Sequence, residues 1–316
     1  MTDTSDGIRL DGKVAIVTGG GRGIGRGVAL KLAAQGAKVV VNDIGAALDG
    51  AGADQTPAQQ VVDEIKAGGG EAIPNYGDVS SFKTGETIVQ EAVDAFGRVD
   101  IVVTPAGILR DRMVFNMTEE EWDAVIAVHL KGTFSVVRHA SILFRQQRGG
   151  RIITFSSVSG LFGSSGQANY GAAKDGIAGF TRVVARDLAR YGVTANTISP
   201  GGETRMTASV PDTTREMRAA GRPPAPEGVL TRAPEHVAPM VAYLASDAAQ
   251  HISGHVFHCV GNIISLMSDP APIKTIHKEG RWTVNELAAV FPGTIGMDLI
   301  NPQPTLPPRD RRPQQS

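Results

Sequence analysis

The sequence predicts an α/β fold: a doubly wound parallel sheet in a single domain with a C-terminal extension. Short apolar runs of strand length alternate with longer amphipathic stretches of helical length, the pattern typical of parallel sheets with right-handed crossovers. The first run, Val14 to Val17, leads directly into a glycine-rich turn and then a helix. Several later runs end in small or polar residues, which would meet at one edge of such a sheet.

Length and composition favour one large domain. The 316 residues would allow two domains, but α/β folds often hold that length in one. We predict a disordered leader at residues 1–9 and a dinucleotide-binding (Rossmann-type) domain at 10–261. The extension at 262–316 would hold one helix at 284–290 and a Pro-rich tail.

Charge and cysteine content restrict the class of protein. A net charge of −1 argues against a nucleic-acid partner, and no apolar run is long enough for a membrane span. Cys259 is the only cysteine, which fits a reducing compartment, and the acidic start of the chain does not resemble a signal peptide. These features predict a cytoplasmic protein without a membrane partner.

Seven strands are predicted from short apolar runs. They lie at 14–17, 37–42, 71–76, 99–103, 151–155, 193–198 and 256–260. The helices predicted between them lie at 26–35, 58–67, 82–96, 118–147, 167–190 and 234–246. The helix from Thr118 has a capping box, with Glu121 three residues after the cap.

The glycine-rich turn after the first strand predicts a dinucleotide site. Gly19 would turn the chain, Gly23 would let a pyrophosphate approach the backbone, and Gly25 would let the helix pack close to the strand. Arg22 and Ile24 lie between them, and the helix N-terminus offers N–H groups to phosphate. A flexible surface turn is the alternative for such a loop taken alone.

A second group, Ser157, Tyr170 and Lys174, predicts proton-transfer chemistry. Tyr170 and Lys174 are four residues apart and so share one face of a helix. An ammonium group beside the phenol would lower the tyrosine pKa and make it a useful acid or base. Ser157, at the end of the fifth strand, could hydrogen-bond a substrate oxygen.

Together these motifs resemble the short-chain dehydrogenase/reductase family over residues 10–261. The resemblance implies that Tyr170 exchanges the proton, Lys174 holds the nicotinamide ribose and Ser157 positions the reacting oxygen. It also implies a small-molecule substrate and a homodimer or homotetramer built partly through the helices at 119–147 and 167–190. The further cofactor contacts that it implies are Asp78, Val79, Gly107, Pro200, Gly201 and Thr204.

Two positions depart from the family pattern. Thr104 and Pro105 stand where two asparagines are usual, which removes an amide side chain and a backbone donor. His129 stands where most members have the asparagine that supports a proton-relay water. Histidine can bind such a water, but a packed, hydrogen-bonded histidine is an equal alternative.

Several stretches are similar to one branch, the (3R)-hydroxyacyl-CoA dehydrogenase units of peroxisomal multifunctional enzymes. They are VVVNDIG at 39–45, AGILRDRM at 106–113, AVHLKGTF at 127–134 and GQANYGAAKDG at 166–176. The branch implies an acyl-CoA thioester substrate, fatty or steroidal. The 3-oxoacyl-carrier-protein reductases and hydroxysteroid dehydrogenases are alternatives, and a non-catalytic dinucleotide sensor or scaffold is an alternative of another class.

Asp43 predicts NAD as the cofactor. It stands at the end of the second strand, eighteen residues after Gly25, near the offset at which an acid binds the adenosine ribose. Its carboxylate would repel the 2′-phosphate of NADP. Arg22 is the opposing feature, since a basic residue there can serve that phosphate, but we expect Asp43 to neutralise it in part. A loop-capping aspartate is the alternative role.

No metal site is predicted. The four residues His251, His255, His258 and Cys259 have a spacing that is not a standard zinc arrangement. His258 and Cys259 would also point to opposite faces of a strand.

Overall fold

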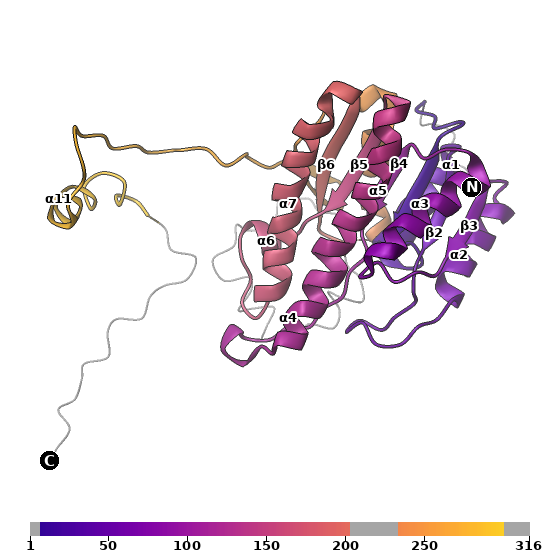
Figure 1. The fold of residues 1–316 in the computed structure, drawn as a ribbon, viewed down its shortest axis with the longest axis horizontal. Helices are drawn as coiled ribbons and strands as arrows, with labels where there is room; N and C mark the ends of the chain where they lie inside the picture. Colours follow the sequence, from indigo (N-terminus) through magenta and orange to yellow (C-terminus); the bar gives the residue numbers. More distant parts are fainter. Residues whose placement is uncertain (1–6, 203–232, 300–316) are drawn as a thin grey trace, which may run out of the picture.

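The computed structural model describes residues 7–202 and 233–299, and in these ranges the chain forms one eight-stranded sheet covered by helices (Figure 1). The strand order is β3-β2-β1-β4-β5-β6-β7-β8. Seven strands run parallel, and β8 runs antiparallel to β7. This architecture confirms the predicted doubly wound parallel sheet.

The seven predicted strands are all present, with bounds shifted by a few residues at most. They are β1 (Val14–Thr18), β2 (Lys38–Asn42), β3 (Ala72–Asn75), β4 (Ile101–Thr104), β5 (Gly150–Phe155), β6 (Val193–Pro200) and β7 (Val256–Val260). The central strands read as continuous apolar runs because both of their faces are buried. In β1, Ala15 and Val17 pack into one core, while Val14 and Ile16 pack into the other.

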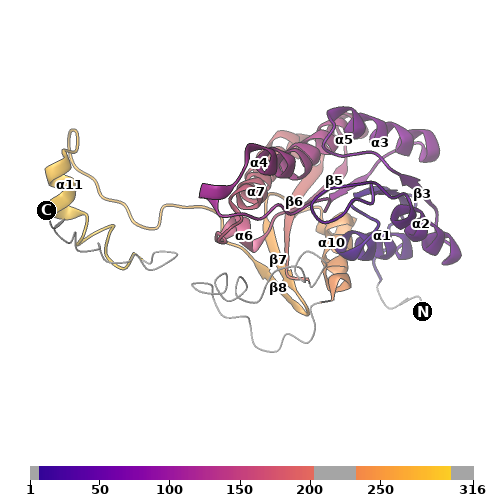
Figure 2. The same cartoon turned by 90° about the horizontal axis from the view of Figure 1, so that it is seen from below.

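Helices cover both faces of the sheet (Figure 2). One face carries α1 (Gly23–Ala34), α2 (Thr56–Ala67) and α10 (Ala238–Ala245). The opposite face carries α3 (Phe82–Phe96), α5 (Gly132–Gln147) and α7 (Ala168–Leu188). None of the described helices is long and apolar enough to cross a bilayer.

The predicted helix at 118–147 is present in three parts. Its capping box is confirmed: the Glu121 amide donates to Thr118 Oγ1 at 3.2 Å, and the Thr118 amide donates to Glu121 at 3.0 Å. The helix starts as α4 (Glu119–Ile126), widens into a π-helical segment at Ala127–Lys131, and continues as α5. The π-helical segment carries His129.

The C-terminal extension contains one strand beyond the prediction. β8 (Ile263–Leu266) pairs with β7 across the turn at Gly261, whose φ of +54° suits glycine. The helix predicted at 284–290 is confirmed as α11 (Val284–Val290). It stands away from the sheet in both views (Figures 1 and 2).

Candidate functional site

The predicted site residues gather at the carboxyl edge of the sheet. Asp43 follows β2, Ser157 lies two residues after β5, and Pro200 ends β6. The strand order reverses between β1 and β4, so the crevice at this edge is the expected ligand position in a doubly wound sheet.

The glycine loop after β1 has no room for side chains. A Cβ added to Gly25 would lie 2.0 Å from the carbonyl oxygen of Gly19, and one added to Gly19 would lie 2.7 Å from Ala106 Cα. Gly19 and Gly23 also have φ of +58° and +51°. Helix α1 starts directly after this loop, and its N-cap residue Arg22 makes no side-chain cap, so the loop fits a dinucleotide pyrophosphate.

Asp43 is held against this loop. Its Oδ2 accepts a hydrogen bond from the Gly21 amide at 2.9 Å, and its Oδ1 accepts one from the Gly45 amide at 2.7 Å. The carboxylate therefore caps the loop, as in the alternative role considered for Asp43. It also lies beside the glycine loop, where it could bind the ribose of a cofactor.

Arg22 does not pair with Asp43 as expected. Its guanidinium lies 3.7 Å from Asp54 Oδ2 and donates to the Ala46 carbonyl at 3.2 Å. The long loop after β2 folds back to supply these partners, which sequence spacing alone does not reveal. Asp54 and the turn at 45–46 thus hold Arg22.

Hydrogen bonds of buried side-chain amides hold the segment after β3 in place. Asn42 Nδ2 donates to Asn75 Oδ1 at 2.7 Å and to the Gly77 carbonyl at 2.9 Å. The two carboxylate oxygens of Asp78 accept hydrogen bonds from the amide and the hydroxyl of Ser80. Val79 is buried. These hydrogen bonds shape the segment that leads to Asp78 and Val79, two of the implied cofactor contacts.

Ser157, Tyr170 and Lys174 come together after β5. Ser157 caps the short helix α6 (Val158–Leu161), accepting from the Ser159 amide at 3.1 Å, so its hydroxyl proton can still be donated elsewhere. Lys174 Nζ donates to the Phe155 carbonyl at 2.8 Å and lies 5.6 Å from the centroid of the Tyr170 ring.

Burial dominates the pKa values of this group. It raises the pKa of Tyr170 to about 12, although a hydrogen bond with Ser157 opposes the shift. It lowers the pKa of Lys174 to about 7, because an ammonium group loses its hydration there. The predicted lowering of the Tyr170 pKa is therefore wrong for the described chain: at neutral pH its phenol is protonated and Lys174 is only partly charged.

His129 lies beside Tyr170. Its ring meets the Tyr170 ring edge-on at 5.1 Å, and its Nε2 is 2.7 Å from the Ile108 carbonyl. Its Nδ1 is buried and has no hydrogen-bond partner among the described residues. Burial first, and then the charge of Lys174, lower its pKa to about 3, so the imidazole is neutral at physiological pH.

The residues around the His129 ring explain the glycine at 107. A Cβ on Gly107 would lie 2.1 Å from His129 Cε1. Thr104 is buried, and its Oγ1 is 3.5 Å from Thr133 Oγ1, so the side chain that replaces the usual asparagine is accommodated. The Ala106 amide donates to Thr18 Oγ1 at 3.4 Å, which connects this turn to the glycine loop.

Sequence reasoning gave no role to Asn169, the residue before Tyr170. Asn169 is fully buried, and its Nδ2 donates to the carbonyls of Arg110 and Glu121 at 2.9 and 3.0 Å. Its Oδ1 accepts from the Tyr170 amide at 2.7 Å. The sequence did contain a signal for this role: an asparagine, whose side-chain amide can both donate and accept hydrogen bonds, stands directly before the tyrosine. Asn169 thus fixes the start of α7 against α4.

The segment after β6 is described only at its start. The Gly201 amide donates to the Cys259 carbonyl at 2.7 Å, and a Cβ on Gly201 would lie 2.6 Å from the Val260 side chain. Thr204 and the apolar segment that follows it lie outside the described residues.

The histidines near β7 make separate contacts. His258 Nδ1 is 2.8 Å from the Ser199 carbonyl, and His255 lies 4.0 Å from Asp269. Within residues 7–202 and 233–299, no three acidic, histidine or cysteine side chains form a cluster suited to a metal ion.

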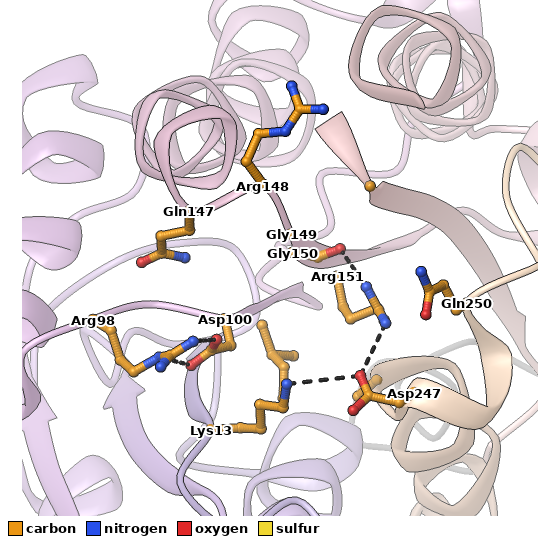
Figure 3. A pocket seen from close by; sticks show the side chains of 13 residues that line it. Lys13, Arg98, Asp100, Gln147, Arg148, Gly149, Gly150, Arg151, Asp247 and Gln250 are labelled. Atoms are coloured by element: carbon orange, nitrogen blue, oxygen red, sulfur yellow. Dashed lines mark hydrogen bonds and ion pairs between the residues drawn. The ribbon is translucent and has the colours of Figure 1, made fainter. Parts of the chain in front are cut away.

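A pocket of about 240 Å³ lies at the opposite, amino edge of the sheet (Figure 3). Four of its charged side chains form ion pairs: Arg98 with Asp100 at 2.6 Å, and Arg151 with Asp247 at 3.1 Å. Lys13 lies 3.7 Å from Asp247 (Figure 3). The pocket contains none of the predicted site residues, and its ion pairs connect the strand starts to the end of α10.

Comparison with known proteins agrees with this geometry. Residues 19–261 match the family described as enoyl-(acyl carrier protein) reductase. The hydroxyacyl-CoA dehydrogenase ChsB1 of Mycobacterium tuberculosis (strain ATCC 25618 / H37Rv) is 44% identical, over 92% of this chain and 90% of its own length. Peroxisomal multifunctional enzyme type 2 of Drosophila melanogaster is 42% identical over 82% of this chain, which spans 41% of that enzyme.

A solved structure shows the same fold. A short chain dehydrogenase from Mycobacterium avium is 45% identical, and the match covers 91% of this chain and 96% of that one with a TM-score of 0.78. The resemblance predicted from the glycine loop and the Tyr-Lys spacing is thereby confirmed, and the chain belongs to the short-chain dehydrogenase/reductase family.

Proposed function

We propose that the protein is an NAD-dependent dehydrogenase that interconverts a 3-hydroxyacyl-CoA and its 3-oxo form. The observation that carries the proposal is the convergence of Ser157, Tyr170 and Lys174 beside a glycine loop with Asp43 bonded to it. The names of the relatives, a hydroxyacyl-CoA dehydrogenase and a peroxisomal multifunctional enzyme, support the substrate class.

Each side chain has one task in this reaction. When bound, the nicotinamide accepts or supplies the hydride. The Tyr170 oxygen takes the proton of the substrate hydroxyl in oxidation and returns it in reduction. The Ser157 hydroxyl orients the reacting oxygen. Lys174, whose Nζ donates to the Phe155 carbonyl, binds the nicotinamide ribose in this proposal. The buried, neutral His129 offers its unpartnered Nδ1 to a relay water.

The substrate class is tested by a panel scored by kcat/KM with NAD. Medium and bulky 3-hydroxyacyl-CoA thioesters should exceed simple alcohols and free sugars. A higher value for acyl-carrier-protein thioesters would favour the reductase alternative, and a higher value for free steroid alcohols would favour a hydroxysteroid dehydrogenase. Dinucleotide binding without turnover of any of these would favour a sensor.

Asp43 sets the choice of NAD, in this proposal, by bonding the ribose hydroxyls and repelling a 2′-phosphate. We expect Asp43→Asn to lower the ratio of kcat/KM for NAD to that for NADP by about tenfold or more, which corresponds to about 1.4 kcal/mol. Steady-state kinetics with both cofactors measure the ratio.

Because Asp43 also anchors the loop, its substitution could lower activity with both cofactors. Such a loss by itself says nothing about the choice between NAD and NADP. Asp54→Asn removes the acid beside Arg22 without touching Asp43 and serves as the matched control. A wild type that prefers NADP, or a ratio unchanged in Asp43→Asn, would contradict the assignment.

The pH dependence of oxidation follows from the Tyr170 pKa. Oxidation needs the phenolate, and burial raises the pKa of Tyr170 to about 12. Below that pKa the phenolate fraction grows about tenfold with each pH unit, so kcat/KM for oxidation should rise between pH 8.5 and 10, a range above the Lys174 pKa of about 7. Reduction uses the phenol, which stays protonated over this range, and should remain level. Initial rates in both directions test this, and equal profiles would contradict it.

The assembly and the compartment complete the proposal. The exposed apolar side chains Phe134, Ile142 and Val183 lie on α5 and α7, which supports a homodimer or homotetramer built through these helices. The single, buried Cys259 supports a reducing compartment such as the cytoplasm.

A further inference from the structure

The connection between β2 and α2, residues 43–55 and here called the β2–α2 loop, is long and exposed. A strand and a helix in this type of fold are usually joined by about 2–6 residues, and longer connections often have a function of their own. Residues 49–55 are all exposed, so the outer part of the loop buries little apolar surface. Its position therefore depends on a few hydrogen bonds, and it can open without unfolding the sheet.

The first attachment of the loop is at the glycine-rich turn after β1. Asp43 accepts from the Gly21 amide at 2.9 Å, and Arg22 donates to the Ala46 carbonyl at 3.2 Å. Arg22 also lies 3.7 Å from Asp54 Oδ2. Both ends of the loop are thus held beside the turn that would bind the pyrophosphate.

The second attachment is on the turn at 108–110, which follows β4. Arg110 Nε donates to the Asp49 carbonyl at 2.9 Å, and the Leu109 amide donates to the Leu48 carbonyl at 2.9 Å. In the sheet, β1 lies between β2 and β4. The loop must therefore pass the end of β1 to reach this turn, and so it spans the carboxyl edge of three strands.

The turn at 108–110 is a fixed anchor for the loop. Ile108 is buried, and its carbonyl oxygen lies 2.7 Å from His129 Nε2. The Arg110 carbonyl accepts from Asn169 Nδ2 at 2.9 Å. The anchor thus belongs to the packed region at the start of α7, whereas the loop meets it with its exposed outer part.

The Arg110 side chain is the stronger of the two links between loop and anchor. Its Nη1 donates to Glu120 at 2.8 Å, which orients the guanidinium group. Glu120 is 83% exposed, so this ion pair contributes little by itself. A charged donor makes a stronger hydrogen bond to a carbonyl than a neutral amide does. We therefore expect Arg110 to contribute more to the attachment than the Leu109 amide.

The span of the loop encloses residues that the family resemblance implies for the cofactor. Asp43 stands where the loop begins, and Gly107 directly precedes the turn at 108–110. A dinucleotide held by both residues would lie within the ring that the loop closes. Its release would then require the second attachment to open, while the first can remain in place.

We propose that Arg110 is a positioning residue that fastens the β2–α2 loop over the bound dinucleotide and thereby limits the rate at which the dinucleotide leaves. The proposal rests on dinucleotide binding, which is one part of the proposed function. It does not depend on the choice between NAD and NADP or on the acyl substrate.

The rate of cofactor release from the full-length enzyme tests the proposal. Enzyme loaded with NADH, or with NADPH if that binds more tightly, is mixed in a stopped-flow instrument with excess oxidised dinucleotide. The loss of fluorescence from the bound reduced form gives the release rate. We expect Arg110→Gln to raise this rate about tenfold, the size expected for losing one hydrogen bond from a charged donor.

Arg112→Gln is the matched control for Arg110→Gln. Arg112 also pairs with an acid of α4, Glu121, at 2.8 Å, but in the described chain its side chain has no hydrogen bond to the loop. Its release rate should stay within about twofold of the wild type, because an exposed ion pair contributes little. An unchanged rate in Arg110→Gln, or equal rates in the two variants, would overturn the proposal.

Two glycines test the same attachment without changing Arg110. Gly50 and Gly52 have φ of +90° and +75°, so alanine strains the backbone at either position. A Cβ on Gly50 would also lie 3.1 Å from Ile108 Cδ1, whereas one on Gly52 would meet nothing within 4 Å. Gly50→Ala should therefore press the loop away from its anchor and speed release more than Gly52→Ala does. The reverse order would count against the proposal.

Hydrogen exchange without cofactor separates a loosened loop from a damaged fold. In Arg110→Gln, the Leu109 amide and the amides at 47–51 should exchange about tenfold faster than in the wild type, and those of β4 and α7 should not change. Faster exchange throughout the sheet would show a structural role and overturn the proposal. A chain that binds neither dinucleotide would contradict the proposed function and the effect on release, while the exchange data would still decide whether Arg110 holds the loop.

Discussion

Replacing Tyr170 by phenylalanine is expected to reduce kcat by about 10²- to 10⁴-fold, the usual contribution of a positioned acid or base. The Tyr170 side chain has a hydrogen bond with Ser157, and Lys174 Nζ lies 5.6 Å from the centroid of its ring, so the proposal assigns it the proton transfer. The ring remains, so its packing against His129 should survive and the fold should be unchanged. Single-turnover rates measure the loss.

Cofactor binding is the control for this substitution. The removed oxygen does not touch the glycine loop, so the Kd for NAD, measured by titration of protein fluorescence, should change by less than about threefold. Turnover near the wild-type rate would reject Tyr170 as the acid and base. Loss of cofactor binding in parallel with turnover would point instead to a damaged fold.

The second large effect is expected at Gly25. A Cβ there would lie 2.0 Å from the Gly19 carbonyl oxygen, which is backbone and cannot turn aside. Gly25→Ala should therefore move α1 away from β1, lower the free energy of unfolding by about 3 kcal/mol and weaken NAD binding. Denaturant unfolding and cofactor titration measure the two losses.

Gly149→Ala is the matched control for Gly25→Ala. Gly149 lies at the amino edge of the sheet, and a Cβ there would meet nothing within 4 Å. This variant should unfold and bind NAD like the wild type. Equal stability of the Gly25 and Gly149 variants would show that the loop is looser than the structure indicates.

The parts of the fold that follow from local patterns were predictable. The strand at Val256–Val260 and the helix at Val284–Val290 have the predicted bounds, because the apolar residues that mark each element lie within its own segment. β8 was not predicted, since it is only four residues long and only two residues separate it from β7. An edge strand of this kind depends on its neighbour more than on its own sequence.

The site was predictable in its positions but less so in its electrostatics. Asp43, Ser157 and Gly201 all lie at the carboxyl edge as expected, because parallel strands end there in order. The Arg22–Asp54 contact depends on the path of a long loop. The pKa of Tyr170 depends on burial by distant parts of the chain, which outweighs a neighbour four residues away.

The π-helical turn at Ala127–Lys131 accommodates one residue more than regular α-helical winding would. One residue corresponds to about 100° of rotation in an α-helix, so a π-helical turn acts as an insertion that resets the phase between α4 and α5. Winding these residues as an α-helix without removing one of them would turn α4 by about 100° away from Asn169, whose amide binds the Glu121 carbonyl. Among homologous sequences, a chain with one residue fewer in this segment should therefore wind as a regular α-helix here and keep the contact between α4 and α7.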